Sequence, residues 1–164
     1  MRRRCGPGST PRSPSAGSID ARVSVPPPRP SPPPIDVRAL IVEDDDACAT
    51  AIAAHMRLHG FFTDRAGTLA EAREALYRFR PVLISVDLNL PDGHGFDFVR
   101  EARAFGVEQV IVVSGERQRD NVIATLEHEV VHYLVKPMRL SELLRALLAV
   151  KASLAAKRDG PVIP

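Results

Sequence analysis

The stretch VLISVDLNLPDG at residues 82–93 decides the fold, because in it an apolar run ends on a carboxylate. Residues 82–86 have the length and the β-branched content of a strand that is buried on both faces, and Asp87 follows directly. Polar residues end three more apolar runs in the same way: Glu43 and Asp44 after residues 39–42, Ser114 after residues 110–113, and Lys136 after residues 133–135. In an open parallel sheet these strand ends share one edge, so the polar side chains are expected in one crevice. Carboxylates, a hydroxyl and an ammonium group together are suited to hold a divalent cation and a phosphoryl group.

Strand and helix patterns alternate from residue 36 to residue 159, which predicts a doubly wound α/β fold with right-handed crossovers. We expect strands at 37–42, 61–65, 82–86, 110–113 and 131–135, and helices at 46–59, 68–80, 96–104, 119–128 and 141–156. Asp45 and Asp46 are expected at the N-terminus of the first helix, Gly60 as its left-handed cap, and Ser141 as the cap of the last helix. Thr68 and Glu71 have the spacing of a capping box for the second helix.

The composition separates a short N-terminal segment from the rest of the chain. Residues 1–35 hold six Arg and one Asp, whereas residues 36–164 hold 16 basic and 19 acidic side chains. The first segment also contains ten of the 15 prolines, and it cannot bury enough apolar surface to offset its ordering entropy. We therefore expect a disordered basic arm at 1–35, one domain at 36–157 and a tail at 158–164.

A basic arm suggests contact with nucleic acid, with membrane lipid or with a partner protein. The arginines are scattered, however, and the arm has neither aromatic residues nor an amphipathic period. We interpret it as a solvated extension or a wrongly assigned translation start, and we do not expect nucleic acid as a partner. The chain has no apolar run of membrane-spanning length and no apolar signal region, which predicts a soluble, cytoplasmic protein without a membrane partner.

Three further patterns have a structural interpretation and a functional one. The apolar stripe of the last helix, at Leu140, Leu143, Leu147, Val150 and Leu154, predicts core packing. Leu144 and Leu148 widen it, which leaves contact with a partner protein or a homodimer through this helix as the alternative. His55 and His59 lie four apart but lack further metal ligands, so a solvated helix face is expected. Cys5 and Cys48 form no disulfide framework, and Cys48 is expected to be a small packing residue.

Four motifs, in this order and at these spacings, resemble the receiver domain of bacterial two-component response regulators. They are LIVEDD at 40–45, VDLNLPDG at 86–93, VVSG at 112–115 and YLVKP at 133–137, and the resemblance covers residues 36–159. It implies a flavodoxin-like fold with strand order 2-1-3-4-5. It also implies that Asp87 takes a phosphoryl group from the phosphohistidine of a histidine kinase or a phosphotransfer protein. The protein would then be a signalling phosphoacceptor, not an enzyme, that assists its own phosphorylation and dephosphorylation.

The resemblance also implies a metal site. Mg²⁺ is the expected cofactor, because it prefers carboxylate and carbonyl oxygens and relieves the repulsion between two anions. Asp44 and Asp87 suit direct coordination, whereas Glu43, one methylene longer, is expected to act through a bound water. The backbone carbonyl of Asn89 is expected to add another ligand.

The remaining motif residues are implied to bind and report the phosphoryl group. Lys136 and Ser114 are expected to bind phosphoryl oxygens. Ser114 and Tyr133 are the expected switch, which reshapes the face of the fourth helix, fifth strand and fifth helix for an unknown downstream protein. Pro137 is the candidate for a cis peptide bond.

The sequence departs from the receiver pattern on the output side. Glu129 and Val130 stand where receivers commonly have Gly-Ala, His132 precedes Tyr133, and Glu116 adds an acid beyond Ser114. Two alternatives therefore remain open: a pseudo-receiver that binds partners without phosphorylation, and a transcription regulator that works through the basic arm. A flavin-binding protein is disfavoured, because no glycine-rich phosphate loop follows the first strand.

Overall fold

The computed structural model describes residues 37–115 and 132–158, all of which belong to the unit Pro34–Pro164. The elements are β1 (Val37–Val42), α1 (Asp46–Leu58), β2 (Phe61–Ala66), α2 (Leu69–Phe79), β3 (Leu83–Asp87), β4 (Asn89–Leu90), β5 (Gly93–His94), α3 (Gly95–Phe105), β6 (Gln109–Gly115), β7 (His132–Lys136) and α5 (Leu140–Arg158). The helix expected at 119–128, the arm at 1–35, and Glu116, Glu129 and Val130 lie outside the described residues. No helix in the described ranges is long and apolar enough to cross a membrane.

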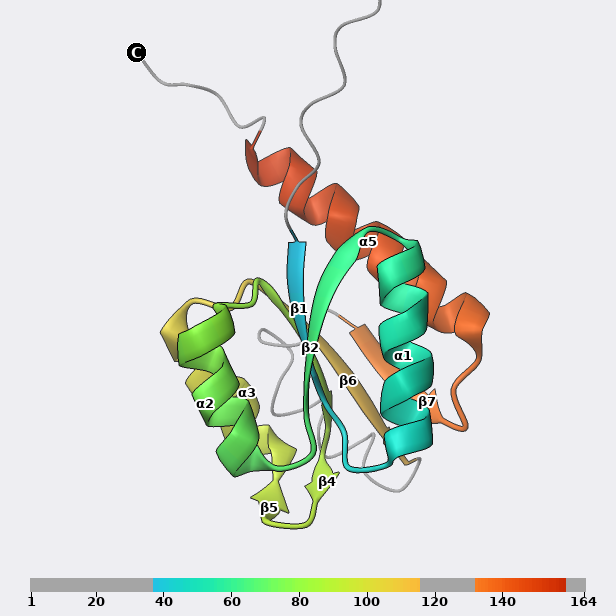
Figure 1. The fold of residues 1–164 in the computed structure, drawn as a ribbon. Helices are drawn as coiled ribbons and strands as arrows, with labels where there is room; N and C mark the ends of the chain where they lie inside the picture. Colours follow the sequence, from blue (N-terminus) through green and yellow to red (C-terminus); the bar gives the residue numbers. More distant parts are fainter. Residues whose placement is uncertain (1–36, 116–131, 159–164) are drawn as a thin grey trace, which may run out of the picture. The chain divides into compact units, whose positions relative to one another are not determined.

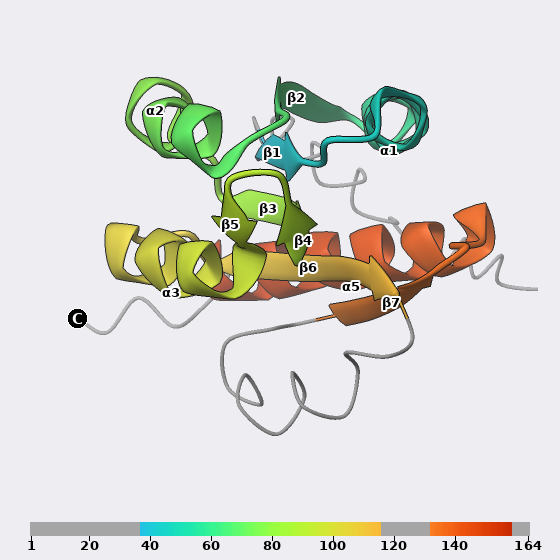
Figure 2. The same ribbon diagram turned by 90° about the horizontal axis from the view of Figure 1, so that it is seen from below.

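The large sheet has the strand order β2-β1-β3-β6-β7, and every neighbouring pair is parallel. Because β6 and β7 are the fourth and fifth strands of this sheet, the predicted order 2-1-3-4-5 is confirmed. Figure 1 shows α1 and α5 on one face of the sheet and α2 and α3 on the other, which is the doubly wound arrangement. Figure 2, seen from below, shows the same helices on the two sides of the sheet.

Each face of the sheet is covered by its own apolar cluster. Ala39 and Ile41 of β1 pack with α1 and α5, whereas Leu40 and Val42 pack with α2 and α3. All five residues of β3 are buried. Successive strand residues point to opposite faces, so the two helix layers explain why β3 is buried on both faces, whereas β2 at the edge of the sheet is not.

The apolar stripe of α5 is mostly core. Leu143, Leu147, Val150 and Leu154 are buried against α1 and the sheet, so the packing interpretation is confirmed for these four residues. Burial of such a side chain contributes about 1.5–3 kcal/mol. Leu148 is 54% exposed and lies outside the core, as does Leu140, so the homodimer alternative is untested.

The helix ends follow the expected caps with two differences. The Asp45 carboxylate accepts a hydrogen bond from the Cys48 amide at 2.6 Å, and Gly60 has a left-handed φ of 81°. Thr68 Oγ1 accepts from the Glu71 amide at 3.2 Å, but the Glu71 carboxylate binds the amide of Gly67, not that of Thr68.

The second difference is at the start of α5. Ser141 is not the cap, because the helix already begins at Leu140. The Arg139 amide donates to the Glu142 carboxylate at 3.2 Å, and Leu143 donates to the Arg139 carbonyl at 3.3 Å. The Glu142 carboxylate therefore satisfies the Arg139 amide, and the helix starts one residue earlier than expected.

The segment after β3 is a hairpin, where the sequence indicated only a loop. Asn89 pairs with His94 and Leu90 with Gly93, so the turn between β4 and β5 is Pro91-Asp92. Proline suits the first central position of such a turn, because its fixed φ matches it. Strands of two residues have no detectable period, and the sequence pattern could not separate them from a loop.

Candidate functional site

The carboxyl ends of four parallel strands meet at one edge of the large sheet. Glu43 follows β1, Asp87 ends β3, Ser114 lies near the end of β6 and Lys136 ends β7. Glu43, Asp87 and Ser114 are 3%, 7% and 0% exposed, so this polar cluster is shielded from solvent. The strands thus bring together residues that are up to 93 positions apart.

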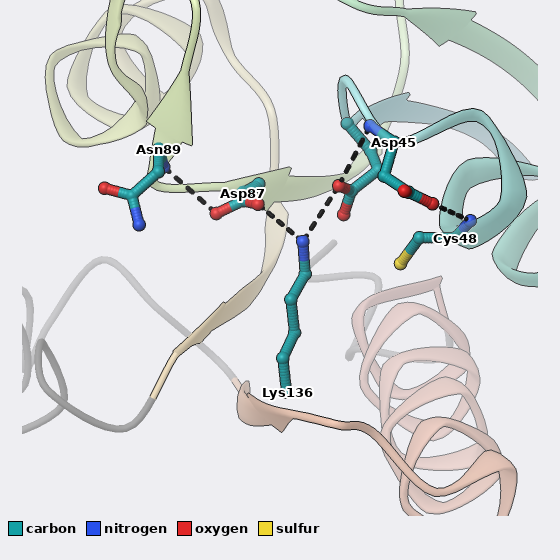
Figure 3. Close-up of polar contacts among 6 residues, drawn as sticks. Asp45, Cys48, Asp87, Asn89 and Lys136 are labelled. Carbon is teal, nitrogen blue, oxygen red and sulfur yellow. Dashed lines mark hydrogen bonds and ion pairs between the residues drawn. The ribbon is translucent and has the colours of Figure 1, made fainter.

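Lys136 is the centre of this cluster. Its ammonium donates to Asp87 Oδ2 at 2.5 Å and to Glu43 Oε1 at 2.8 Å. Figure 3 shows the Lys136 side chain extending from β7 toward Asp87. Burial alone would lower the pKa of Lys136, but the hydrogen bonds to Asp87 and Glu43 outweigh it and raise the pKa above its usual value. The ammonium is therefore charged at neutral pH.

Three carboxylates next to the ammonium fit a hard divalent cation. Glu43, Asp44 and Asp87 each offer an oxygen, and these oxygens lie within 4.8 Å of one another. Glu43 Oε2 is buried and has no hydrogen-bond partner among the described residues, so it retains an unused acceptor. An all-oxygen set with one exposed member, Asp44, suits Mg²⁺, which keeps part of its water shell.

The hairpin after Asp87 contacts the carboxylate of this candidate phosphoacceptor directly. The backbone amide of Asn89 donates to Asp87 Oδ1 at 3.0 Å, as Figure 3 shows. One oxygen of the Asp87 carboxylate is thus held by this amide and the other by Lys136. This contact places the Asn89 backbone beside the carboxylates.

The expected switch residues are Ser114 on β6 and Tyr133 on the neighbouring strand β7. Ser114 is fully buried, and Tyr133 packs against the cluster of α2 and α3. The Tyr133 hydroxyl is buried and has no hydrogen-bond partner in the described part of the chain. The peptide bond between Lys136 and Pro137 is cis, at the position that the sequence indicated as the candidate.

Sequence reasoning missed Gly95 as a residue of this site. A Cβ at Gly95 would lie 2.2 Å from the backbone oxygen of Asp87, so only glycine fits against the backbone of the candidate phosphoacceptor. The Gly95 amide also donates to the Leu88 carbonyl at 2.9 Å, which closes the hairpin. The available signal was the glycine itself at the end of a turn-rich segment.

Cys48 and the histidines of α1 have different surroundings. Cys48 is half-buried and packs against the cluster of α1 and α5, which confirms it as a packing residue. Burial and the nearby Glu43 raise the pKa of its thiol to about 11. His55 and His59 are half-buried, and their rings meet edge to face with the centroids 4.9 Å apart, so this face of α1 is only partly exposed to solvent.

The comparison with protein families identifies the type of domain. The sequence model of the response regulator receiver domain family matches residues 39–148 of this chain.

The chain belongs to the response regulator receiver domain family.

Curated relatives and a solved structure agree with this family. The chain is 32% identical to the KDP operon transcriptional regulatory protein KdpE of Escherichia coli, over 76% of this chain and 56% of that protein. It is 31% identical to the DNA-binding response regulator MtrA of Mycolicibacterium smegmatis, over 76% and 53%. The putative response regulator from Chloroflexus aurantiacus superposes with a TM-score of 0.62 at 27% identity, covering 73% of this chain and 98% of that one. The chain thus spans about half the length of these two curated relatives.

Family membership defines the general role of the domain. Receiver domains are signalling proteins of two-component systems, which interact with histidine kinases and downstream effectors. They generally bind Mg²⁺ at an acidic pocket, and in this receiver the corresponding cluster is Glu43, Asp44 and Asp87.

Proposed function

We propose that this receiver is the phosphoacceptor of a two-component or phosphorelay system and that Asp87 carries the phosphoryl group. The observation that supports the proposal is the contact of Lys136 with Asp87 and Glu43 beside a cluster of three carboxylates. A cation and acidic groups at one sheet edge provide both the nucleophile and the charge compensation that phosphoryl transfer needs.

In the proposed reaction a carboxylate oxygen of Asp87 attacks the phosphorus of a phosphohistidine. The new O–P bond forms while the P–N bond breaks, and the electron pair stays on the imidazole nitrogen of the donor. Lys136 and Ser114 bind the phosphoryl oxygens. In dephosphorylation a water oxygen bonds to the phosphorus, the O–P bond to Asp87 breaks, and inorganic phosphate leaves.

The metal site in this proposal consists of Asp44 and Asp87 as direct ligands, Glu43 through a water, and the Asn89 carbonyl. Bound Mg²⁺ would neutralise part of the negative charge that the carboxylates and the phosphoryl group bring together. The Asn89 amide holds Oδ1 of the Asp87 carboxylate, and the Lys136 ammonium holds Oδ2.

We further propose that residues 36–157 form the receiver unit and that it signals to a downstream protein through Ser114 and Tyr133. A phosphoryl group on Asp87 would attract the Ser114 hydroxyl and leave room into which the half-buried Tyr133 can turn. Two curated relatives are named as transcriptional or DNA-binding regulators, and this chain spans about half of each. The expectation that nucleic acid is not a partner of this chain therefore stays a prediction.

Mass spectrometry after incubation with acetyl phosphate tests the phosphoacceptor role. The wild type is expected to gain the mass of one phosphoryl group in the presence of Mg²⁺ and to gain none in EDTA. The Asp87→Asn variant is expected to gain none in either buffer. Asp64→Asn is the matched control. Asp64 of β2 forms a salt bridge of 2.6 Å with Arg78 of α2, and it is not part of the carboxylate cluster.

Unchanged labelling of Asp87→Asn would refute Asp87 as the acceptor. The pseudo-receiver would be favoured by two results together: the wild type stays unlabelled, and the wild type and Asp87→Asn bind a partner protein equally well. Salt-dependent DNA binding that disappears with residues 1–35 would favour regulation through the basic arm.

A further inference from the structure

The turn of the hairpin after Asp87 is tied to the beginning of α2. The Asp92 carboxylate accepts hydrogen bonds from the amides of Leu69 and Ala70, at 2.8 Å and 3.0 Å. These two amides belong to the first turn of α2, where no carbonyl within the helix is available to them. Their hydrogen bonds lower the pKa of Asp92, so the acceptor is charged at neutral pH.

A second contact joins the same two elements. A Cβ at Gly93 would lie 2.8 Å from Leu69 Cδ1, so the hairpin backbone sits directly on the Leu69 side chain. Leu90 of β4 is buried in the same apolar cluster as Leu69. Figure 1 shows β4 and β5 beside the end of α2 at which the helix begins.

The other strand of the hairpin reaches the carboxylate cluster. Asn89 pairs with His94 across the hairpin, and its amide donates to Asp87 Oδ1 at 3.0 Å. Only three positions separate Asn89 from Asp92, and the hairpin pairing restricts their relative movement. A shift of the turn away from α2 would therefore move the Asn89 backbone relative to Asp87.

We propose that Asp92 is a positioning residue for the metal site, because it fixes the hairpin on α2 and thereby holds the Asn89 backbone, whose amide contacts Asp87. This inference rests on the proposed function, in which the Asn89 carbonyl is a Mg²⁺ ligand. By linkage, metal binding stabilises the hairpin and with it the hydrogen bonds of Asp92 to Leu69 and Ala70. The beginning of α2 is then coupled to the occupancy of the site.

A plain helix cap is the competing explanation, and Thr68 allows the two to be separated. Thr68 Oγ1 accepts from the Glu71 amide at the same end of α2, but Thr68 is not part of the hairpin. Removal of either side chain weakens the beginning of α2. Only the loss of Asp92 also releases the hairpin.

Isothermal titration with MgCl₂ compares the wild type with Asp92→Ala and Thr68→Ala. Asp92→Ala is expected to raise the Mg²⁺ dissociation constant by about threefold to tenfold, which is less than the loss of a direct outer-sphere partner of a metal causes, because Asp92 acts through the hairpin. Thr68→Ala is expected to change it by less than about twofold, although both variants melt at a lower temperature. If Asp92→Ala does not fold, Asp92→Asn replaces it; the neutral amide keeps one acceptor oxygen, so a smaller increase is expected.

Hydrogen exchange gives an independent readout of the coupling. In the wild type, Mg²⁺ is expected to slow exchange of the Leu69 and Ala70 amides, and in Asp92→Ala this effect is expected to vanish. Equal Mg²⁺ affinities of the wild type and Asp92→Ala would overturn the positioning role. Equal losses of Mg²⁺ affinity in Asp92→Ala and Thr68→Ala would do the same, and both outcomes would leave the proposed metal site standing. A wild type that binds no Mg²⁺ would overturn the proposed metal site, and the role of Asp92 with it.

Discussion

Replacement of Lys136 by methionine tests the electrostatics of the site most directly. The ammonium binds Asp87 at 2.5 Å and Glu43 at 2.8 Å, and these residues are 7% and 3% exposed. Methionine keeps an unbranched chain but removes the charge, so two shielded carboxylates would face each other without compensation. Without metal, we expect the Lys136→Met variant to be less stable than the wild type.

The magnitude follows from the burial of the three groups. Removal of one partner from a fully buried ion pair costs about 3–5 kcal/mol, whereas an exposed pair contributes about 0–1 kcal/mol. The Lys136 side chain is 29% exposed and its partners are buried, so a loss of about 2 kcal/mol is expected. For a domain of this size, such a loss lowers the melting temperature by about 6 °C.

The pH of the measurement follows from the pKa of Lys136, which is raised above its ordinary value of 10.5. A group whose pKa is higher in the folded state stabilises the fold fully below its unfolded pKa, and the contribution disappears as the pH rises through the folded pKa. At pH 7.5 the whole contribution is therefore present. Urea unfolding of the wild type and of Lys136→Met in EDTA, followed by far-UV circular dichroism, measures it.

Mg²⁺ and a second lysine provide the controls. Mg²⁺ is expected to raise the free energy of unfolding more in Lys136→Met than in the wild type, because the variant has no ammonium that competes with the metal for the carboxylates. Lys157→Met should change the free energy of unfolding by less than about 0.5 kcal/mol, since Lys157 and its partner Glu108 are 59% and 42% exposed. A Lys136→Met variant that is as stable in EDTA as the wild type would refute the reasoning.

Three further predictions concern single residues. Gly95→Ala should lower the free energy of unfolding by about 2 kcal/mol or more, because the new Cβ would lie 2.2 Å from a backbone oxygen of Asp87; a loss under about 1 kcal/mol in urea unfolding would contradict this contact. Leu147→Ala should cost about 2–4 kcal/mol, whereas Leu148→Ala, at a position that is 54% exposed, should cost less than about 0.5 kcal/mol; similar losses would show that α5 packs differently. Alkylation of Cys48 by iodoacetamide at pH 8 should be on the order of a hundredfold slower in the folded protein than in urea, since its pKa is raised to about 11, and equal rates would exclude a shielded thiol.

The large sheet was predictable because its strands carry a strong local signal. Apolar runs of three to five residues that are rich in β-branched side chains fit strands that are buried on both faces, and the polar residue that ends each run marks the carboxyl edge. Parallel strands then place Glu43, Asp87, Ser114 and Lys136 at one edge without any further information.

Short elements and helix ends were less predictable, because their signals come from elsewhere in the chain. The hairpin of β4 and β5 has only two residues in each strand, and Asp92 at its turn binds amides 23 and 22 positions earlier. At α5 the Glu142 carboxylate binds the Arg139 amide, so the helix begins before Ser141. A local capping motif cannot show which of two nearby groups will satisfy an amide.

The sequence by itself determined the type of fold and the set of residues at the carboxyl edge, because periodicity and residue type are local properties. Only the tertiary structure decided that Lys136 contacts both Glu43 and Asp87, that Gly95 lies against the backbone of Asp87, and that Asp92 joins the hairpin to α2. These contacts depend on strand register and on side-chain rotamers across long separations, and side-chain rotamers are set by packing against neighbours that no local pattern specifies.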